Sequence, residues 1–216
     1  MIQKMLRSIT AKHHLNAITI GEYAKMKVGV MNFQIWAFHA EGLGHVSAMQ
    51  ASGMLGLMKM DTLIINPTEK DMPLFSYDRV HAMGNDTLIY ELYDTILDRA
   101  DLSRVEEVKA KYTSLPAHDL GEHWYDSIKL AVSLAKKGKK SHTADFDACA
   151  MEYLEAFLED AASAPYCEPA GKKEKASVYV EGLLKHGGPS TDVFKKGIGD
   201  EKTAELFRNI LFGTAR

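Results

Sequence analysis

Apolar and polar residues alternate along much of the first half of the chain, and this period-two pattern predicts β-strands. The strand expected over 74–82 places Phe75 and Tyr77 on one face and Leu74 and Val80 on the other. The turn Gly84-Asn85-Asp86 then separates it from the next strand. Further strands are expected over residues 28–41, from His45 onward, over 62–65 and over 87–93. The joining turns are short, which favours an antiparallel meander over βαβ units, since those need a helix between neighbouring strands.

One carboxylate interrupts the apolar face of the strand over 74–82. Asp78 shares that face with Leu74 and Val80. A buried carboxylate is unfavourable unless it is paired or hydrogen-bonded, so Asp78 needs either a partner or a function. The pattern leaves two interpretations open: an ion pair with a cation on a neighbouring strand, or a chemical role in a pocket.

Helical spacing of apolar residues takes over after residue 100. The clearest helix starts near Ser141 and carries an apolar stripe that includes Phe146, Tyr153 and Phe157. Other helices are expected from Asp101 to before Pro116, over 123–135, from about Glu174 to Lys185, over 191–211 and, in broken form with a second segment over 19–26, within 1–27. Strands followed by helices predict an α+β protein with helices packed on an antiparallel sheet. We expect one domain over 1–216, strand-rich over 28–95 and helix-rich over 100–216.

Composition narrows the classes of function. The 216 residues have a net charge of -3, which argues against nucleic-acid binding because that calls for a basic excess. The two cysteines, Cys149 and Cys167, have no metal-binding or redox spacing. No apolar run reaches the length of a membrane span, and the N-terminus has no signal-peptide core. We therefore expect a soluble cytoplasmic protein without a membrane partner.

The common catalytic motifs are absent from the sequence. It contains no Walker loop, dinucleotide fingerprint, nucleophile elbow or zinc-binding helix pair. Three histidines of the strand-rich half, His39, His45 and His81, could meet in space, but unrelated positions are the simpler interpretation. We expect no metal site.

Two stretches resemble the ferredoxin-dependent bilin reductases. In the first, Pro67 is followed by Asp71-Met72-Pro73 and then by a strand carrying Asp78, as in the central motif of that family. In the second, Tyr179 on a helix precedes Val193-Phe194, Gly199, Glu201 and the closing run 206–212, which resemble the family's final helices. The two stretches have the family's order and spacing. Between residues 96 and 172 the alignment is not apparent.

The resemblance implies a three-layer α/β/α sandwich with a central antiparallel sheet. An open-chain tetrapyrrole such as biliverdin would lie between the sheet and the C-terminal helices. The resemblance implies no bound flavin, nicotinamide or metal: single electrons would come from reduced ferredoxin, or from flavodoxin, and protein acids would protonate the bilin radical. Asp78 would be the catalytic acid. Leu74, Val80 and a flat apolar ligand would desolvate it, which raises the pKa of a carboxyl group into a range useful for proton donation.

The sequence departs from the family pattern at several positions. Thr62 falls where some members carry a histidine, and Gly187-Gly188 falls at an Asn-Asp pair that supplies a second aspartate. His186 and Asp192 lie close by and are candidates to replace it. Gln50, at the place of an inward glutamate, and Asn66, at the end of a strand, complete the candidate substrate-binding residues together with Thr62. Three functions therefore stay open: a reductase of a linear tetrapyrrole, as in the red chlorophyll catabolite reductases or in the bilin reductases themselves, a non-catalytic tetrapyrrole carrier, or a protein-interaction subunit.

Lysines cluster at two places in the helix-rich half. They are Lys136, Lys137, Lys139 and Lys140, and then Lys172, Lys173 and Lys175. An acidic ferredoxin would dock on such a basic surface. The end of a helix would equally account for the first group, because cations are favoured at helix C-termini.

Overall fold

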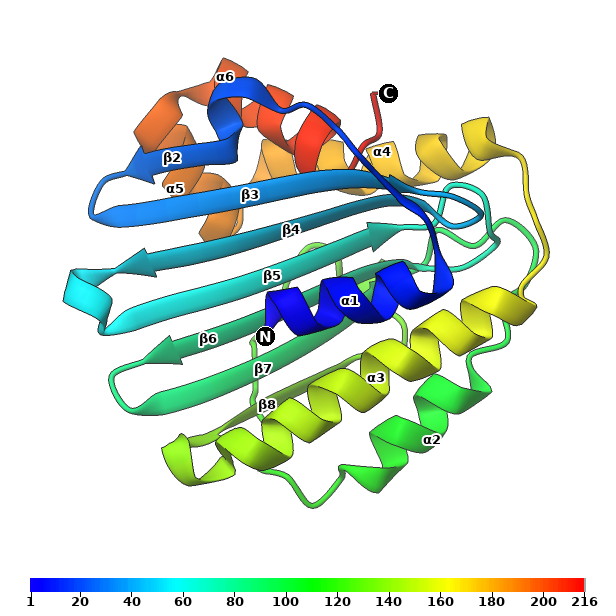
Figure 1. The fold of residues 1–216 in the computed structure, drawn as a ribbon, viewed down its shortest axis with the longest axis horizontal. Coiled ribbons are helices and arrows are strands. Elements are labelled where there is room, and N and C mark those ends of the chain that lie inside the picture. Colours follow the sequence, from blue (N-terminus) through cyan, green and yellow to red (C-terminus); the bar gives the residue numbers. More distant parts are fainter. Residues whose placement is uncertain (216) are drawn as a thin grey trace.

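The computed structural model describes residues 1–215, apart from the side chains of residues 54 and 189, and consists of three layers (Figure 1). The central layer is an antiparallel sheet of eight strands in the order β1-β3-β4-β5-β6-β7-β8, with β2 paired to β3. The strands are β1 (Leu15–Ala17), β2 (Lys25–Val28), β3 (Met31–Ala40), β4 (Gly44–Gly53), β5 (Met58–Asn66), β6 (Leu74–Ala82), β7 (Asn85–Tyr93) and β8 (Leu134–Lys139). The expected α+β sandwich is confirmed.

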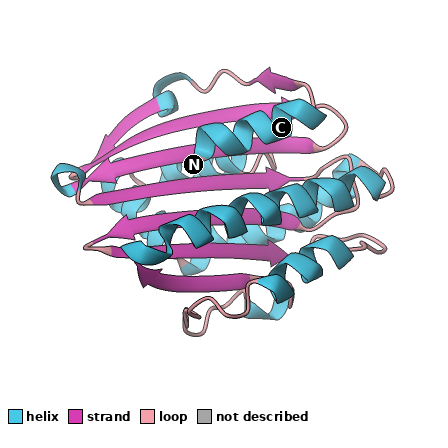
Figure 2. Cartoon of the chain, turned by 60° about the horizontal axis from the view of Figure 1, so that its bottom comes forward, coloured by secondary structure: helices cyan, strands magenta, loops and turns pink. Residues whose placement is uncertain are grey.

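Helices cover both faces of the sheet. On one face lie α1 (Ile2–Lys12), α2 (Ser103–Lys111) and the long helix α3 (Thr143–Ser163); Figure 2 shows these three in front of the strands. On the other face lie α4 (Pro169–His186), α5 (Pro189–Ile198), α6 (Asp200–Glu205) and the π-helical segment η5 (Leu206–Leu211). No helix among residues 1–215 is both long and apolar enough to cross a membrane.

Two hydrophobic cores follow from the alternation along each strand. On β6, Phe75 and Tyr77 pack into the core beneath α1 and α3, whereas Leu74 packs into the core beneath the C-terminal helices. Asp78 has the same parity as Leu74, so it lies on the face that the C-terminal helices cover. The sequence pattern thus places this carboxylate in the interface between the sheet and those helices.

The turn between β6 and β7 fixes the register of the two strands around Asp78. Met83 and Gly84 both have positive φ, 51° and 76°, as a two-residue type I′ turn requires. The turn is therefore centred one residue earlier than Gly84-Asn85-Asp86, and Ala82 pairs with Asn85. This register places Ile89 opposite Asp78.

Two of the expected helices are wrong. Residues 123–135 form one 3₁₀ turn, η3 (Asp126–Ile128), followed by the edge strand β8, and residues 19–26 form the 3₁₀ turn η1 (Gly21–Ala24) followed by β2. Short apolar runs fit both periodicities, and here the unpaired edges of β7 and β3 attract a further strand. The lysines after Ala135 therefore lie on and just after an edge strand and not at the end of a helix.

The remaining helices match the sequence pattern with shifted ends. Helix α4 begins at Pro169, ahead of the expected start near Glu174. Proline suits the first turn because its missing N–H has no partner there, and Glu168 caps the helix by accepting a hydrogen bond from the Gly171 N–H at 3.0 Å. This early start brings Lys172 into the helix, where it is fully buried.

Candidate functional site

A cavity of about 250 Å³ lies between the sheet and the C-terminal helices. Strands β4–β7 form its floor, and α4, η5 and the segment over 118–128 form its walls. Most of the lining is apolar and aromatic, including Met49, Met60, Ile64, Ile89, Phe207 and Leu211. A concave apolar site with few polar groups is the usual form of a small-molecule pocket.

Asp78 projects from β6 into this cavity. Its Oδ1 accepts a hydrogen bond of 2.5 Å from the hydroxyl of Thr62 on β5. Desolvation raises the pKa of Asp78 to about 6, the charge of Glu91 adds to this rise, and hydrogen bonds from Thr62 and Ser76 oppose it. Among residues 1–215 the structure places no cation within ion-pair distance of Asp78, so the interpretation as half of an ion pair is not supported. A carboxyl group with this pKa is partly protonated near neutral pH and can both donate and accept a proton.

Aromatic rings form one wall of the cavity. Tyr93 stacks on Tyr179 with ring centroids 4.1 Å apart, and the edge of Tyr125 meets Tyr93 at 5.5 Å. His123 stacks on Tyr125 at 4.8 Å. Burial raises the pKa of Tyr93 and Tyr179 well above its ordinary value, so both phenols stay neutral. Flat neutral surfaces of this kind suit stacking against a conjugated planar ligand.

Glu91 is a second carboxyl group of the cavity that the sequence pattern did not single out. It lies on β7 directly opposite Ser76, on the same face of the sheet as Asp78. Its Oε2 accepts a 2.7 Å hydrogen bond from the hydroxyl of Tyr93, and Lys129 Nζ lies 3.7 Å from Oε1. A two-residue turn at Met83-Gly84 would have predicted this position, because that turn alone sets the register of β7 against β6.

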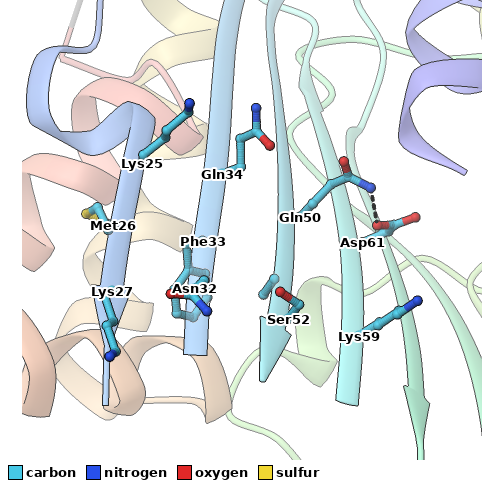
Figure 3. Close-up of a pocket in the computed structure, with 11 residues that line it drawn as sticks. Lys25, Met26, Lys27, Asn32, Phe33, Gln34, Gln50, Ser52, Lys59 and Asp61 are labelled. Carbon is cyan, nitrogen blue, oxygen red and sulfur yellow. Dashed lines mark hydrogen bonds between the residues drawn. The ribbon is translucent and has the colours of Figure 1, made fainter. Parts of the chain in front are cut away.

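Gln50 lies on the opposite face of the sheet and does not reach the cavity. Its neighbour Met49 lines the cavity, and side chains of consecutive strand residues point to opposite faces. Gln50 Nε2 donates a hydrogen bond of 2.9 Å to Asp61 Oδ1. Both residues line a separate polar groove together with Lys25, Lys27 and Lys59 (Figure 3). The structure therefore does not bring Gln50 together with Asp78.

Asn66 faces the C-terminal helices but is occupied elsewhere. Its Nδ2 donates a 2.8 Å hydrogen bond to the Phe212 carbonyl, and its side chain is completely buried below the lining of the cavity. Ser47 and His45 hold the same segment, with Ser47 donating to the Leu211 carbonyl at 2.7 Å and His45 Nε2 lying 2.7 Å from the Ile210 carbonyl oxygen. Asn66 thus fixes the wall that η5 contributes.

His186 and Asp192 lie outside the cavity lining. His186 is exposed at the end of α4 with its ring 5.4 Å from that of Trp124, and Asp192 lies in the first turn of α5 beside Gly187. The first turn of α5 does reach the cavity, through Ser190 and Thr191. Hydroxyl groups therefore line the cavity where the resemblance leads one to expect a second aspartate.

The strand histidines do not form a metal site. His39 is the register partner of His45, but His39 lies 3.3 Å from Glu69 and His45 contacts the Ile210 carbonyl. His81 lies 3.3 Å from Asp86 at the other end of the sheet. Over the described part of the chain, no three side chains of the metal-binding types come together.

The sequence matches no protein-family model and no curated protein. The structure, however, superimposes on the crystal structure of phytochromobilin synthase from tomato in complex with biliverdin, with a TM-score of 0.79 and 16% sequence identity over 99% of this chain and 82% of that chain. The chain has the bilin reductase fold. The fold that the two sequence stretches implied is therefore confirmed. It is an α+β fold with an open antiparallel sheet.

Proposed function

We propose that this protein reduces a linear tetrapyrrole of the biliverdin type. The proposal rests mainly on Asp78, a half-buried carboxyl group with a raised pKa that projects into an aromatic-walled cavity between the sheet and the helices. The fold supports it, because the tomato structure with this fold contains biliverdin. In our proposal the electrons come one at a time from reduced ferredoxin or flavodoxin, and Asp78 supplies protons.

Two molecules of reduced donor each lose one electron, and one carbon–carbon double bond of the tetrapyrrole gains these two electrons and two protons to become a single bond with two new C–H bonds. Adding electrons without protons would build negative charge in a poorly solvated cavity, which is unfavourable. Asp78 provides a proton to the singly reduced pigment and regains one from solvent before the second transfer.

The other polar groups of the cavity suit orientation of the pigment. Thr62 holds the Asp78 carboxyl group in one position by its hydrogen bond. Ser190 and Thr191 offer hydroxyl groups that can bond the polar groups of a tetrapyrrole, and the Tyr93–Tyr179 stack offers a flat surface for its rings.

Not all lysines of the two sequence clusters are exposed, so fewer of them can form a basic surface for the acidic donor protein. Lys137, Lys139 and Lys140 are exposed on and after the edge strand β8. Lys172 is fully buried and bonds the carbonyls of Met72 and Thr95, so it is not available for docking. We expect electron transfer to slow at high salt, since charge complementarity accelerates association mainly at low ionic strength.

Visible spectroscopy tests the proposal. Purified protein is mixed with biliverdin without oxygen, and reduced ferredoxin is then added, with oxidised ferredoxin as the control. A shifted, sharpened spectrum that changes further only with reduced ferredoxin is the expected result. A shift without turnover would identify a tetrapyrrole carrier on the same fold, and no shift would favour a protein-interaction role.

A further inference from the structure

Three hairpin tips at one end of the sheet expose apolar side chains to solvent; Figure 1 shows this end at its left edge. The first tip, between β2 and β3, lies beside the second because Met31 pairs with Gly53. The second, between β4 and β5, lies beside the third because Met58 pairs with Ala82. The exposed side chains are Val30 (71%), Leu55 (fully exposed), Leu57 (68%) and Met83 (78%). Neighbouring exposed apolar side chains indicate a surface that contacts an apolar partner.

Backbone conformation does not account for the apolar residues at two of these tips. Leu55 and Met83 have φ values of 56° and 51°, in the left-handed region that Gly and Asn adopt far more readily. An Asn at either position would fit the turn better and would remove the exposed apolar surface. A contact outside the chain gives a reason for Leu and Met at these positions.

A row of polar side chains with two lysines lies directly beside the first two tips. It consists of register partners on β2, β3, β4 and β5, which share one face of the sheet and are all exposed: Lys27, Asn32, Ser52 and Lys59 (Figure 3). Within residues 1–215, neither lysine lies within ion-pair distance of a carboxylate. The two hairpin segments, 25–34 and 50–60, contain a third lysine, Lys25, and no Asp or Glu. This end of the sheet is therefore both apolar and positively charged.

A hollow of about 420 Å³ connects the polar row with the first two tips. Lys27, Asn32 and Ser52 line it, and so do Val30 and Leu55. The same three polar residues also line the larger groove of Figure 3, so the hollow and the groove adjoin. An ammonium group, an amide and a hydroxyl group provide the hydrogen-bond donors that a phosphate or a carboxylate requires, and apolar side chains lie next to them.

We propose that this end of the sheet binds the surface of a membrane that contains anionic lipids. The apolar tips enter the boundary between headgroups and acyl chains, and a lipid headgroup lies in the hollow with the ammonium groups of Lys27 and Lys59 near its negative charge. Separate tips at one end of a sheet match a flat apolar boundary, whereas a protein partner would need a pocket for each tip. A surface contact of this kind needs no membrane-spanning helix, and it does not depend on the proposed reaction.

Cosedimentation of the whole chain with lipid vesicles tests the lysines. Vesicles of phosphatidylcholine alone are compared with vesicles of equal parts of phosphatidylcholine and phosphatidylserine. We expect binding only to the vesicles with phosphatidylserine, and we expect high salt to abolish it because salt screens the attraction. Lys27→Gln and Lys59→Gln should each weaken binding about fivefold, which is the effect of one lysine near an anionic membrane surface. Lys185→Gln, at an exposed position of α4, is the control and should bind as the wild type does.

Asparagine at the tips tests the apolar contact while keeping the fold, because Asn suits the left-handed conformation. We expect Leu55→Asn and Met83→Asn to have a free energy of unfolding at least as large as that of the wild type, and the double variant to bind vesicles more weakly by about tenfold or more. Val178→Asn removes a similarly exposed apolar side chain from α4 and should leave binding unchanged. Lipids with brominated acyl chains should quench the indole of Leu55→Trp more strongly than those of Trp36 and Trp124.

Three results would overturn the proposal. The first is no binding to phosphatidylserine vesicles at low salt, or wild-type binding by the double variant of Leu55 and Met83. The second is binding of soluble glycerophosphoserine as tight as that of the vesicles, which would make the hollow an anion site without a membrane contact. The third is no vesicle binding together with slower reduction by ferredoxin in the double variant, which would assign the tips to a protein partner.

Discussion

The hydroxyl of Thr62 donates a 2.5 Å hydrogen bond to Oδ1 of Asp78 across the paired strands β5 and β6. This bond favours the ionised carboxylate, while desolvation favours the protonated acid and outweighs it, so that the pKa of Asp78 is about 6. The two opposing effects leave the pKa of Asp78 just below neutral pH, so that a minor fraction of the carboxyl group is still protonated there. Thr62 therefore sets how readily Asp78 gives up its proton.

Replacing Thr62 with Val should raise the pKa of Asp78 further. Hydrogen bonds to charged groups contribute about 1.5–3 kcal/mol, which corresponds to a rise of about one to two pH units. Infrared titration of the Asp78 carboxyl band would measure the shift. The variant Thr87→Val, on the same face of β7 and opposite Val80, is the control and should leave the titration unchanged. A pKa that falls or stays constant in Thr62→Val would contradict this account of the hydrogen bond.

Asp78→Asn should make the protein more stable at neutral pH. The folded-state pKa of Asp78 lies above its ordinary value of 3.8, so the folded protein binds more protons than the unfolded chain between about pH 4 and 6. The contribution of this group to stability is then complete below pH 4 and is lost as the pH rises through about 6. We expect the free energy of unfolding of the variant to exceed that of the wild type by about 1–3 kcal/mol at pH 7.5 and by little at pH 4.

Urea unfolding at both pH values measures this difference. The exposed Asp98→Asn change is the control, and we expect it to show no comparable dependence on pH. An Asp78→Asn variant that is less stable than the wild type at pH 7.5 would show that the carboxylate is well solvated or paired.

Lys172 provides a second linkage between pH and stability. It lies 3.8 Å from Asp71 and donates hydrogen bonds to the carbonyls of Met72 and Thr95 beneath α4, and desolvation lowers its pKa from 10.5 to about 8. Because the unfolded chain holds this proton up to higher pH, Lys172 makes the free energy of unfolding rise between about pH 8 and 10.5. Lys172→Met should abolish that rise, and it should destabilise the protein by leaving the Met72 and Thr95 carbonyls without their hydrogen-bond donor, at a cost of about 1–3 kcal/mol for each unsatisfied group.

Lys185→Met, at an exposed position of the same helix, is the control for this prediction. Its free energy of unfolding should follow the wild-type pH dependence. Equal pH profiles for wild type and Lys172→Met in urea unfolding would rule out the linkage.

Two glycines of α4 should respond in opposite ways to alanine. A Cβ at Gly182 would lie 2.1 Å from the indole of Trp124, whereas a Cβ at Gly171 would meet Leu97 at an ordinary 3.5 Å. Gly171→Ala should stabilise the protein by about 0.4–1 kcal/mol through the lower entropy of the unfolded chain. Gly182→Ala should destabilise it by about 1–3 kcal/mol because Trp124 must leave its position. Thermal unfolding and Trp fluorescence measure both; stabilisation by Gly182→Ala would contradict the close contact.

The layers of the fold could be predicted from the sequence because each long strand has a clean alternation. Strand β6 begins and ends where the pattern of 74–82 places it, and the phase of that pattern alone assigns Asp78 to one face. Strand β8 could not be predicted in this way. Its residues 134–139 fit a helix as well as a strand, and pairing with the edge of β7 decides between them.

The candidate site was only partly predictable for a similar reason. Asp78 and Thr62 come together because consecutive strands of a meander pair, which the sequence shows. Gln50 lies one position along the strand from Met49, which lines the cavity, and a shift of one residue moves a side chain to the other face of a sheet. The position of Glu91 could be predicted only with the correct centre of the Met83-Gly84 turn. The positions of Ser190 and Thr191 depend on the path of the chain after α4, which only tertiary packing determines.

Turnover by Asp78→Asn tests the central claim most directly. The variant and the wild type are given biliverdin and reduced ferredoxin without oxygen, with Asp98→Asn as the control, and absorbance and electron paramagnetic resonance follow the pigment. We predict that Asp78→Asn binds biliverdin with a Kd close to that of the wild type, reduces it about 100-fold more slowly and accumulates a pigment radical, because a positioned general acid typically contributes about 10²–10⁴-fold. Reduction by Asp78→Asn at the wild-type rate, with no radical, would contradict the account.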